Sequence, residues 1–298
     1  MKLFSRNMAR TPITRGSWHN TPWRGVVLAL ILAAGCGPTY PKERVISELQ
    51  RVCREEKNIS VQAQLVGTNM VVFMPLDELF DIKLDIVPAA IEKIEDVVQI
   101  TSRVIFSSDA KIEFYTLVVA DVATTGAELV WIRYVDDIHR LINGWISREE
   151  YRKRVVWQIT FSPERLSQQS FDFAPFASLT LPKFLARELT QRVNVVLEDS
   201  SYRAKVKGEY AEPFRELRFS LVVADDATFR RVHVPVIMRE VADVMRQYRF
   251  KDFDFVVVQN VYTKESVTVG QDRLAGYLRE DIRALLRPKA QPMRMPAS

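Results

Sequence analysis

Apolar residues recur along the chain at two spacings, one typical of helices and the other of strands. Where they return every three or four positions, a helix with one buried face is predicted; where they alternate with polar residues or form a short unbroken run, a strand is predicted. The predicted helices cover 42–57, 88–101 and about 271–286, and the predicted strands are Ile59–Val66 and Met70–Met74 with a turn at 67–69, then 115–124, 202–211 and 252–263.

One ten-residue stretch occurs twice. The sequence YTLVVADVAT at 115–124 returns as FSLVVADDAT at 219–228, with seven of the ten positions identical. The neighbouring segments correspond as well, and together they predict two copies of a helix–strand–strand–helix unit that arose by duplication. Each copy begins with a helix that starts near a proline, Pro88 or Pro182. After the repeated stretch, each has a second strand, Glu128–Tyr134 or Arg231–Val236. Each then has another helix, which starts at Val135 or Val241.

This order of elements predicts an α+β fold with two small sheets, mixed or antiparallel. We expect a first α+β domain over 42–161 and a second over 182–286, followed by a disordered tail over 287–298. The segment 162–181 has no periodicity and is predicted to be a linker. Its aromatic residues indicate that part of it packs against a folded surface: Phe171, Phe173 and Phe176.

The first 35 residues have the organisation of a secretory signal peptide. Five basic residues and no acidic ones precede a short apolar run, Val26–Gly35. A membrane-spanning helix needs about 20 apolar residues, so this run is too short to span a bilayer.

The end of the run, Ala33-Ala34-Gly35-Cys36, resembles the lipobox of bacterial lipoproteins. The resemblance implies cleavage between Gly35 and Cys36, lipidation of the Cys36 thiol and acylation of the new amino terminus. Several acyl chains give durable anchoring, so residues 36–41 would tether the chain to the bacterial cell envelope, facing the periplasm. Gly37 follows the cysteine in place of Asp, which by the family's sorting rule favours the outer membrane over the inner. The alternative is an ordinary signal peptide that contains Cys36.

The formal charge of +5 comes from 42 basic and 37 acidic residues. Since five of the basic residues lie in the signal peptide, the remaining chain carries 37 of each sign and is neutral. A neutral chain has no basic field to attract phosphates, so nucleic acid is not expected as a partner. The mixed-charge segments 51–57 and 148–154 are expected to be solvated helix faces.

Beyond Cys36, Cys53 is the one other cysteine in the chain. It falls in phase with the apolar residues of the predicted helix 42–57, so we expect a thiol buried in the core. A single thiol cannot form an internal disulfide. An intermolecular disulfide or a nucleophilic role are the alternatives.

Candidate catalytic residues are few. Asp121 and Asp225, the latter followed by Asp226, end the two copies of LVVAD, a position suited to a metal ligand or a general base. Aspartate is also favoured at strand ends because its carboxylate accepts hydrogen bonds from turn amides, and this is the role we expect. His139 is expected at the surface and His233 in a strand, and the chain has no nucleophile elbow, zinc-protease motif or glycine-rich phosphate loop. No metal or cofactor is expected.

Residues 142–154, INGWISREEYRKR, predict a turn between two helices. Gly144 is placed to end the first helix, and Ser147 with Glu150 has the spacing of a capping box. The stretch from Gly144 to Tyr151 resembles a segment of short helical oligomerisation modules at the ends of bacterial proteins. The whole resemblance covers barely twenty residues, so no function is carried over from it. Trp145 is expected to pack into the core; the alternative is an exposed Trp145, which would mark an interface.

These patterns favour a non-catalytic, membrane-anchored lipoprotein that acts as a scaffold or binds an envelope protein partner. One alternative is a carrier of lipid or another small ligand, which predicts an enclosed apolar cavity. Another is an envelope hydrolase, which predicts a pocket joining Asp121 or Asp225 to His139 or His233.

Overall fold

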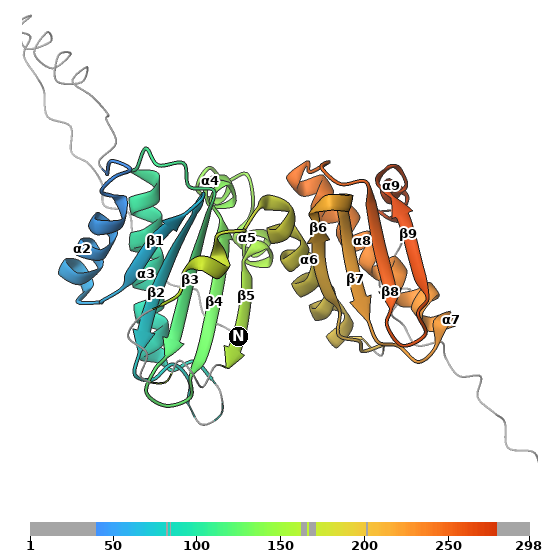
Figure 1. Cartoon of the computed structure of the whole chain (residues 1–298), viewed down its shortest axis with the longest axis horizontal. Helices are drawn as coiled ribbons and strands as arrows, with labels where there is room; N and C mark the ends of the chain where they lie inside the picture. Colours follow the sequence, from blue (N-terminus) through green and yellow to red (C-terminus); the bar gives the residue numbers. More distant parts are fainter. Residues whose placement is uncertain are drawn as a thin grey trace, which may run out of the picture. The chain divides into compact units, whose positions relative to one another are not determined.

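The computed structural model describes residues 40–278 except 82, 84, 162–165, 167–170 and 201. The predicted signal peptide, the cleavage site at Gly35 and Cys36, most of the tether, the end of the last helix and the tail lie outside the described residues. From Tyr40 onward the chain forms one compact unit that contains two β-sheets (Figure 1). Among the described helices, none has the length and apolar character needed to cross a bilayer.

The first sheet has five strands in the order in which they occur in the chain. Its second and third strands are parallel and are joined by a crossover helix, while all other neighbours are antiparallel. The strands are β1 (Gln62–Val66), β2 (Asn69–Leu76), β3 (Phe114–Asp121), β4 (Ala127–Tyr134) and β5 (Val156–Phe161), and the helices are α2 (Val45–Lys57), α3 (Pro88–Phe106), α4 (Val135–Ile142) and α5 (Arg148–Arg154).

The second sheet has four strands, again in chain order and again with a parallel central pair. The strands are β6 (Lys207–Ala211), β7 (Glu216–Leu221), β8 (Phe255–Asn260) and β9 (Ser266–Gly270), and the helices are α6 (Leu181–Glu198), α8 (Val234–Tyr248) and α9 (Leu274–Tyr277), with short turns of helix at α7 (Asp226–Thr228), η2 (Ala174–Phe176), η3 (Glu212–Phe214), η4 (Phe229–His233) and η5 (Gln271–Arg273).

The two sheets follow the same path, and the predicted α+β class is confirmed. A helix, a hairpin and a crossover helix occur as α2-β1-β2-α3 and again as α6-β6-β7-α8, and a second hairpin completes each sheet as β3-β4 and β8-β9. The LVVAD match, however, aligns two strands that occupy different positions in their sheets. It equates β3, which runs into an antiparallel partner, with β7, which is followed by a crossover helix.

The predicted strand at Arg231–Val236 is wrong. These residues form η4 and the first turn of α8. The alternation of Val232, Val234 and Val236 matches a strand, but Pro235 lacks the N–H that a central strand needs and suits the first turn of a helix. The helix predicted from Val241 therefore begins at Val234.

Other predicted elements differ from the structure in where they begin or end. The hairpin of β1 and β2 is confirmed, with Gly67 in the left-handed region and Asn69 already paired with Val66. Of the predicted strand 202–211, only the part from Lys207 is a strand. The described part of the predicted last helix consists of η5 and the short α9.

Each sheet buries an apolar core under its helices. Leu49 of α2 and Val97 of α3 pack on one face of the first sheet, and Leu189 of α6 and Val244 of α8 pack on the second. The other face of the first sheet is covered from the predicted linker, where Phe171 stacks on Phe73 with ring centroids 4.6 Å apart. That packing was expected from the aromatic residues; the division into two domains stays a prediction.

Candidate functional site

Asp121 is fully buried at the end of β3 and serves the turn that follows. Its carboxylate accepts hydrogen bonds from Thr124 N at 2.9 Å, Thr124 Oγ1 at 2.6 Å and Leu79 N at 3.3 Å. Burial opposes ionisation, but these hydrogen bonds outweigh it and lower the pKa of Asp121. The carboxylate is thus occupied by its own turn, as expected from its position.

Asp225 also serves local structure, although it is exposed. It caps α7 by accepting hydrogen bonds from Ala227 N at 3.1 Å and Thr228 N at 2.8 Å. Its neighbour Asp226 accepts hydrogen bonds from Thr263 Oγ1 at 2.5 Å and Asn260 Nδ2 at 3.2 Å, and so ties α7 to the end of β8. Both acidic residues therefore stabilise the loops that follow β7 and β8 at one end of the second sheet.

The two histidines are placed apart from these carboxylates. His139 is exposed on α4 with its ring 4.6 Å from the ring of Phe106. His233 is buried in η4, in place of the predicted strand, and its Nε2 lies 3.1 Å from the carbonyl oxygen of Tyr202. Burial lowers the pKa of His233. In the described part of the chain, neither ring forms a hydrogen bond or ion pair with Asp121 or Asp225.

Cys53 lies on the buried face of α2 and its thiol is in the core, as expected. Burial raises the pKa of its thiol to about 11, which disfavours the thiolate that a nucleophile needs. Over the residues that the structure describes, no group of three His, Cys, Asp or Glu side chains is arranged to hold a metal ion.

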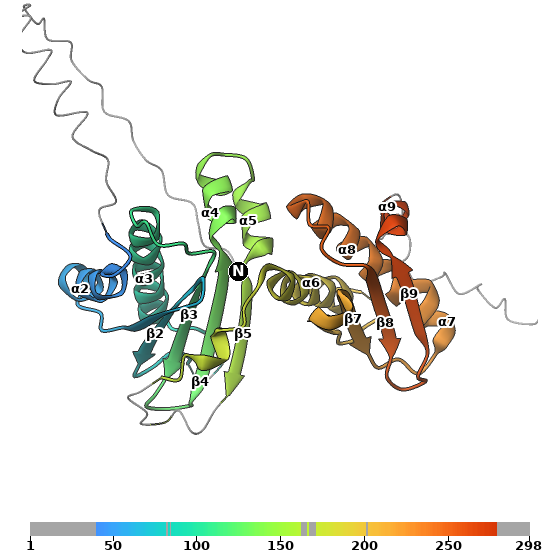
Figure 2. The same ribbon diagram turned by 45° about the horizontal axis from the view of Figure 1, so that its top comes forward.

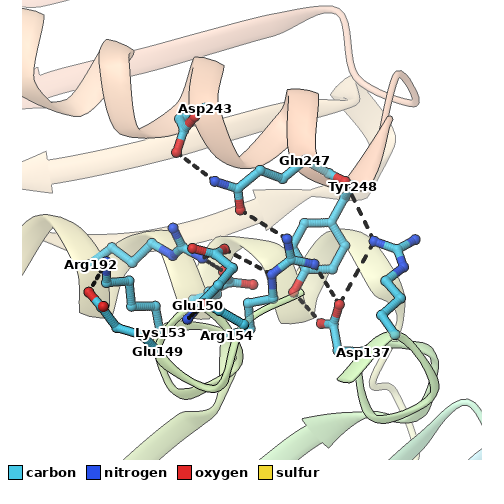
Figure 3. Close-up of polar contacts among 12 residues, drawn as sticks. Asp137, Glu149, Glu150, Lys153, Arg154, Arg192, Asp243, Gln247 and Tyr248 are labelled. Carbon is cyan, nitrogen blue, oxygen red and sulfur yellow. Dashed lines mark hydrogen bonds and ion pairs between the residues drawn. The ribbon is translucent and has the colours of Figure 1, made fainter. Parts of the chain in front are cut away.

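A buried network of charged side chains joins the α4–α5 hairpin to α6 and α8 (Figure 3). At its centre, Arg154 Nη1 lies 2.6 Å from Asp137 Oδ1, and both side chains are almost fully buried. The hydroxyl of Tyr248 donates to the other Asp137 oxygen at 2.5 Å. The Arg154 guanidinium also lies over the Tyr248 ring, 4.8 Å from its centroid.

The network continues along α6. Glu150 Oε1 accepts from Arg154 Nε at 3.0 Å and from Arg192 Nη2 at 3.2 Å. Arg192 Nη2 lies 2.7 Å from Glu188 Oε1, although neither Glu188 oxygen receives a well-directed hydrogen bond. On α8, Gln247 accepts from Arg154 at 3.2 Å.

The acidic members of this network differ in pKa because they differ in surroundings. Full burial raises the pKa of Glu188 to about 7, against the opposing charge of Arg192. Burial also raises the pKa of Asp137, although the Tyr248 hydroxyl and Arg154 oppose the shift. Glu150 is less buried, and its two arginine partners hold its pKa below the usual range. Four helices are therefore held together by charges whose balance depends on pH.

Sequence reasoning did not identify this network. Residues 148–154 were expected to form a solvated helix face, but Arg154 is buried. Its partners Asp137 and Tyr248 lie 17 and 94 positions away in the sequence, so a single sequence gives no signal of the pairing. A hollow of about 310 Å³ beside the network has mixed charge on its walls, with Lys153, Glu150 and Asp243 among its lining residues.

A larger hollow of about 690 Å³ lies on the face of the second sheet. Its walls mix charged and polar side chains, among them Lys207, Glu216 and Arg218, with the apolar side chains of Phe219 and Val257. A lipid carrier needs apolar walls, so this hollow does not suit a lipid.

Among the places where large apolar side chains are exposed, the edge strand β5 and the α4–α5 turn each present more than one. On the edge strand β5, Trp157, Ile159 and Phe161 are 51%, 39% and 59% exposed. In the turn between α4 and α5, Ile142 is 66% and Trp145 is 73% exposed. The expectation that Trp145 packs into the core is therefore wrong: the turn carries it away from the sheet.

The alternation of β5 is visible in the sequence, but hydrophobic spacing does not reveal whether the apolar side of an edge strand is covered. The predicted lipidation site Cys36 and the adjoining Gly35 lie outside the described residues. Comparisons with protein-family models, with curated protein sequences and with solved structures found no match for this chain.

Proposed function

We propose that this chain is a lipid-anchored protein of the bacterial cell envelope that binds a protein partner and does not catalyse a reaction. The lipobox at Cys36 supports the anchor. The observation that carries partner binding is the exposed, uncharged edge strand β5. The hydrogen bonds that occupy Asp121 and Asp225 support a structural role for the carboxylates that a hydrolase would have used.

The three exposed side chains of β5 form a continuous stripe. Alternate residues of a strand point to the same side, so Trp157, Ile159 and Phe161 share one face. The register places them opposite Trp131, Leu129 and Ala127 of β4, on the side of the sheet that α2 and α3 cover further along. The stripe therefore extends an apolar surface past the end of its helical cover.

The backbone at the same residues is directed away from the sheet. Trp157 N donates to Gln191 Oε1 on α6 at 2.9 Å. Because backbone direction alternates with the same period as the side chains, the N–H groups of Ile159 and Phe161 point outward too. An added segment could thus bond to the backbone and cover the stripe at once, which is the mode of β-strand addition.

Edge strands that must not pair usually carry charges or proline. The outer strand β6 follows this pattern, with Lys207 and Glu209 exposed, whereas the outer strands β1, β5 and β9 have no charged residue and no proline. Of these three strands, β5 is the one that exposes large apolar side chains. Covering one of its exposed side chains would contribute roughly 1–2 kcal/mol. The edge thus has the composition of a binding surface.

Site-specific cross-linking in a bacterium that processes lipoproteins tests this function. A photoreactive phenylalanine analogue at Phe161 is expected to give one adduct of defined mass, and the same analogue at Lys264, exposed on the β8–β9 turn, is expected to give none. Ile159→Asp should abolish the Phe161 adduct while leaving the melting temperature within a few degrees. Equal adducts at both positions, or an adduct that survives Ile159→Asp, would contradict partner binding at β5.

A further inference from the structure

The turn between α4 and α5 presents two apolar side chains on an ordered backbone. Trp145 is the most exposed large apolar residue in the described part of the chain. Gly144 adopts a φ of +71°, and Trp145 N donates to the carbonyl oxygen of Arg140 at 2.8 Å. On the far side, Ser147 caps α5 by accepting from Glu150 N at 3.1 Å. A rigid turn therefore holds Ile142 and Trp145 in solvent.

This turn lies at the end of the first sheet where the chain enters the folded unit. Tyr40 pairs with Ser108 and donates its N–H to the carbonyl oxygen of Ser107 at 3.0 Å, just after the end of α3. The last residue of α3, Phe106, packs against His139 of α4 with their rings tilted. Both views of the fold show α4 and α5 at this end of the sheet (Figures 1 and 2).

The chain between the predicted lipid attachment and Tyr40 is short. Four residue steps lead from Cys36 to Tyr40, and four extended residues span at most about 14 Å. A lipid on Cys36 therefore keeps Tyr40, which lies at this end of the first sheet, within about that distance of the bilayer surface. Tryptophan favours the interface between headgroups and acyl chains, because its ring is apolar and its N–H is polar.

We propose that the α4–α5 turn inserts Trp145 and Ile142 into the headgroup region of the lipid bilayer as a second membrane contact, which fixes the orientation of the protein. This inference rests on the proposed lipid anchor, because the short tether is what places the turn at the surface. The charges near the turn suit a contact with anionic lipid. Residues 142–148 contain Arg148 and no acidic residue, and the first acidic residue after them, Glu149, is paired with Lys153 at 3.1 Å. A basic residue there is attracted to anionic headgroups.

Quenching of tryptophan fluorescence by brominated acyl chains tests the contact. The full acylated protein is placed in vesicles of phosphatidylethanolamine and phosphatidylglycerol that carry bromine on the acyl chains. After removal of the signal peptide, three tryptophans remain: Trp131, Trp145 and Trp157. We expect bromolipid quenching in the unmodified protein, loss of that quenching in Trp145→Phe, and its retention in the matched control Trp157→Phe.

Flotation and intact mass, measured on the same samples, separate the two proposals. An acylated protein that floats with the vesicles but whose quenching is absent, or is unchanged by Trp145→Phe, would overturn the second contact alone; the exposed turn would then face solvent or a protein. A protein without acyl chains that fails to float would overturn the anchor and this inference with it.

Discussion

The substitution Glu188→Gln isolates the electrostatic cost of the buried network. Glu188 is a fully buried residue of α6, with Arg192 on the same helix and Tyr248, Asp137 and Arg154 around it. Glutamine has nearly the same shape as the protonated acid and cannot ionise. The variant therefore keeps the packing and removes one titration.

The expected magnitude follows from the pKa. Glu188 has an ordinary pKa of 4.5, which burial raises to about 7 in the folded protein. Between these values the folded chain keeps a proton that the unfolded chain has lost, so stability falls as pH rises and is lowest above pH 7. The gap between these two values corresponds to roughly 3–4 kcal/mol, at roughly 1.4 kcal/mol per pKa unit.

Urea unfolding of the two proteins at several values between pH 4 and pH 8.5 measures this effect. Carboxylates outside this network titrate alike in both proteins, so their contributions cancel in the difference. Relative to wild type, Glu188→Gln is expected to gain roughly 3–4 kcal/mol of stability between pH 4 and pH 8. A difference that does not change with pH, or that moves in the opposite direction, would refute the assigned burial of an ionisable Glu188.

Two further predictions concern residues that the sequence marked as chemical candidates. Asp121→Ala leaves buried turn donors without an acceptor and is expected to cost about 2–4 kcal/mol of unfolding free energy, whereas Asp225→Ala removes only an exposed helix cap and should cost about 1 kcal/mol; equal costs in urea unfolding would argue against this assignment. Cys53 is expected to resist a thiol reagent at pH 8 in the folded protein and to react fully in urea, because burial keeps it protonated; rapid reaction in the native state would mean that the thiol is accessible.

Local hydrophobic and turn patterns in the sequence were enough to predict many of the helices and strands. The hairpin of β1 and β2 was predictable because a glycine turn separates two short runs rich in strand-forming residues, and α3 because Pro88 starts a run with helical spacing. The first LVVAD lies in β3, as predicted, but of the second copy only Leu221 lies in β7, so similar sequences specify neither where a strand ends nor its topology. A buried strand of either sheet needs the same apolar residues, whether a hairpin or a crossover helix follows it.

Features that depend on three-dimensional proximity were not predictable. Alternating valines made Arg231–Val236 resemble a strand, although the proline among them favoured the helix that forms. The association of Asp137 with Arg154 and Tyr248 depends on how the hairpin meets α8. Exposure of Trp145 depends on the direction of a turn, and apolar composition alone made burial the natural expectation.

Intact mass of the protein from a bacterium that processes lipoproteins, beside a Cys36→Ala variant, tests the central claim most directly. We predict a mass equal to residues 36–298 plus acyl chains, and loss of both acylation and membrane association in the variant. A soluble, unacylated chain whose mass and location are unaffected by Cys36→Ala would contradict the lipid anchor.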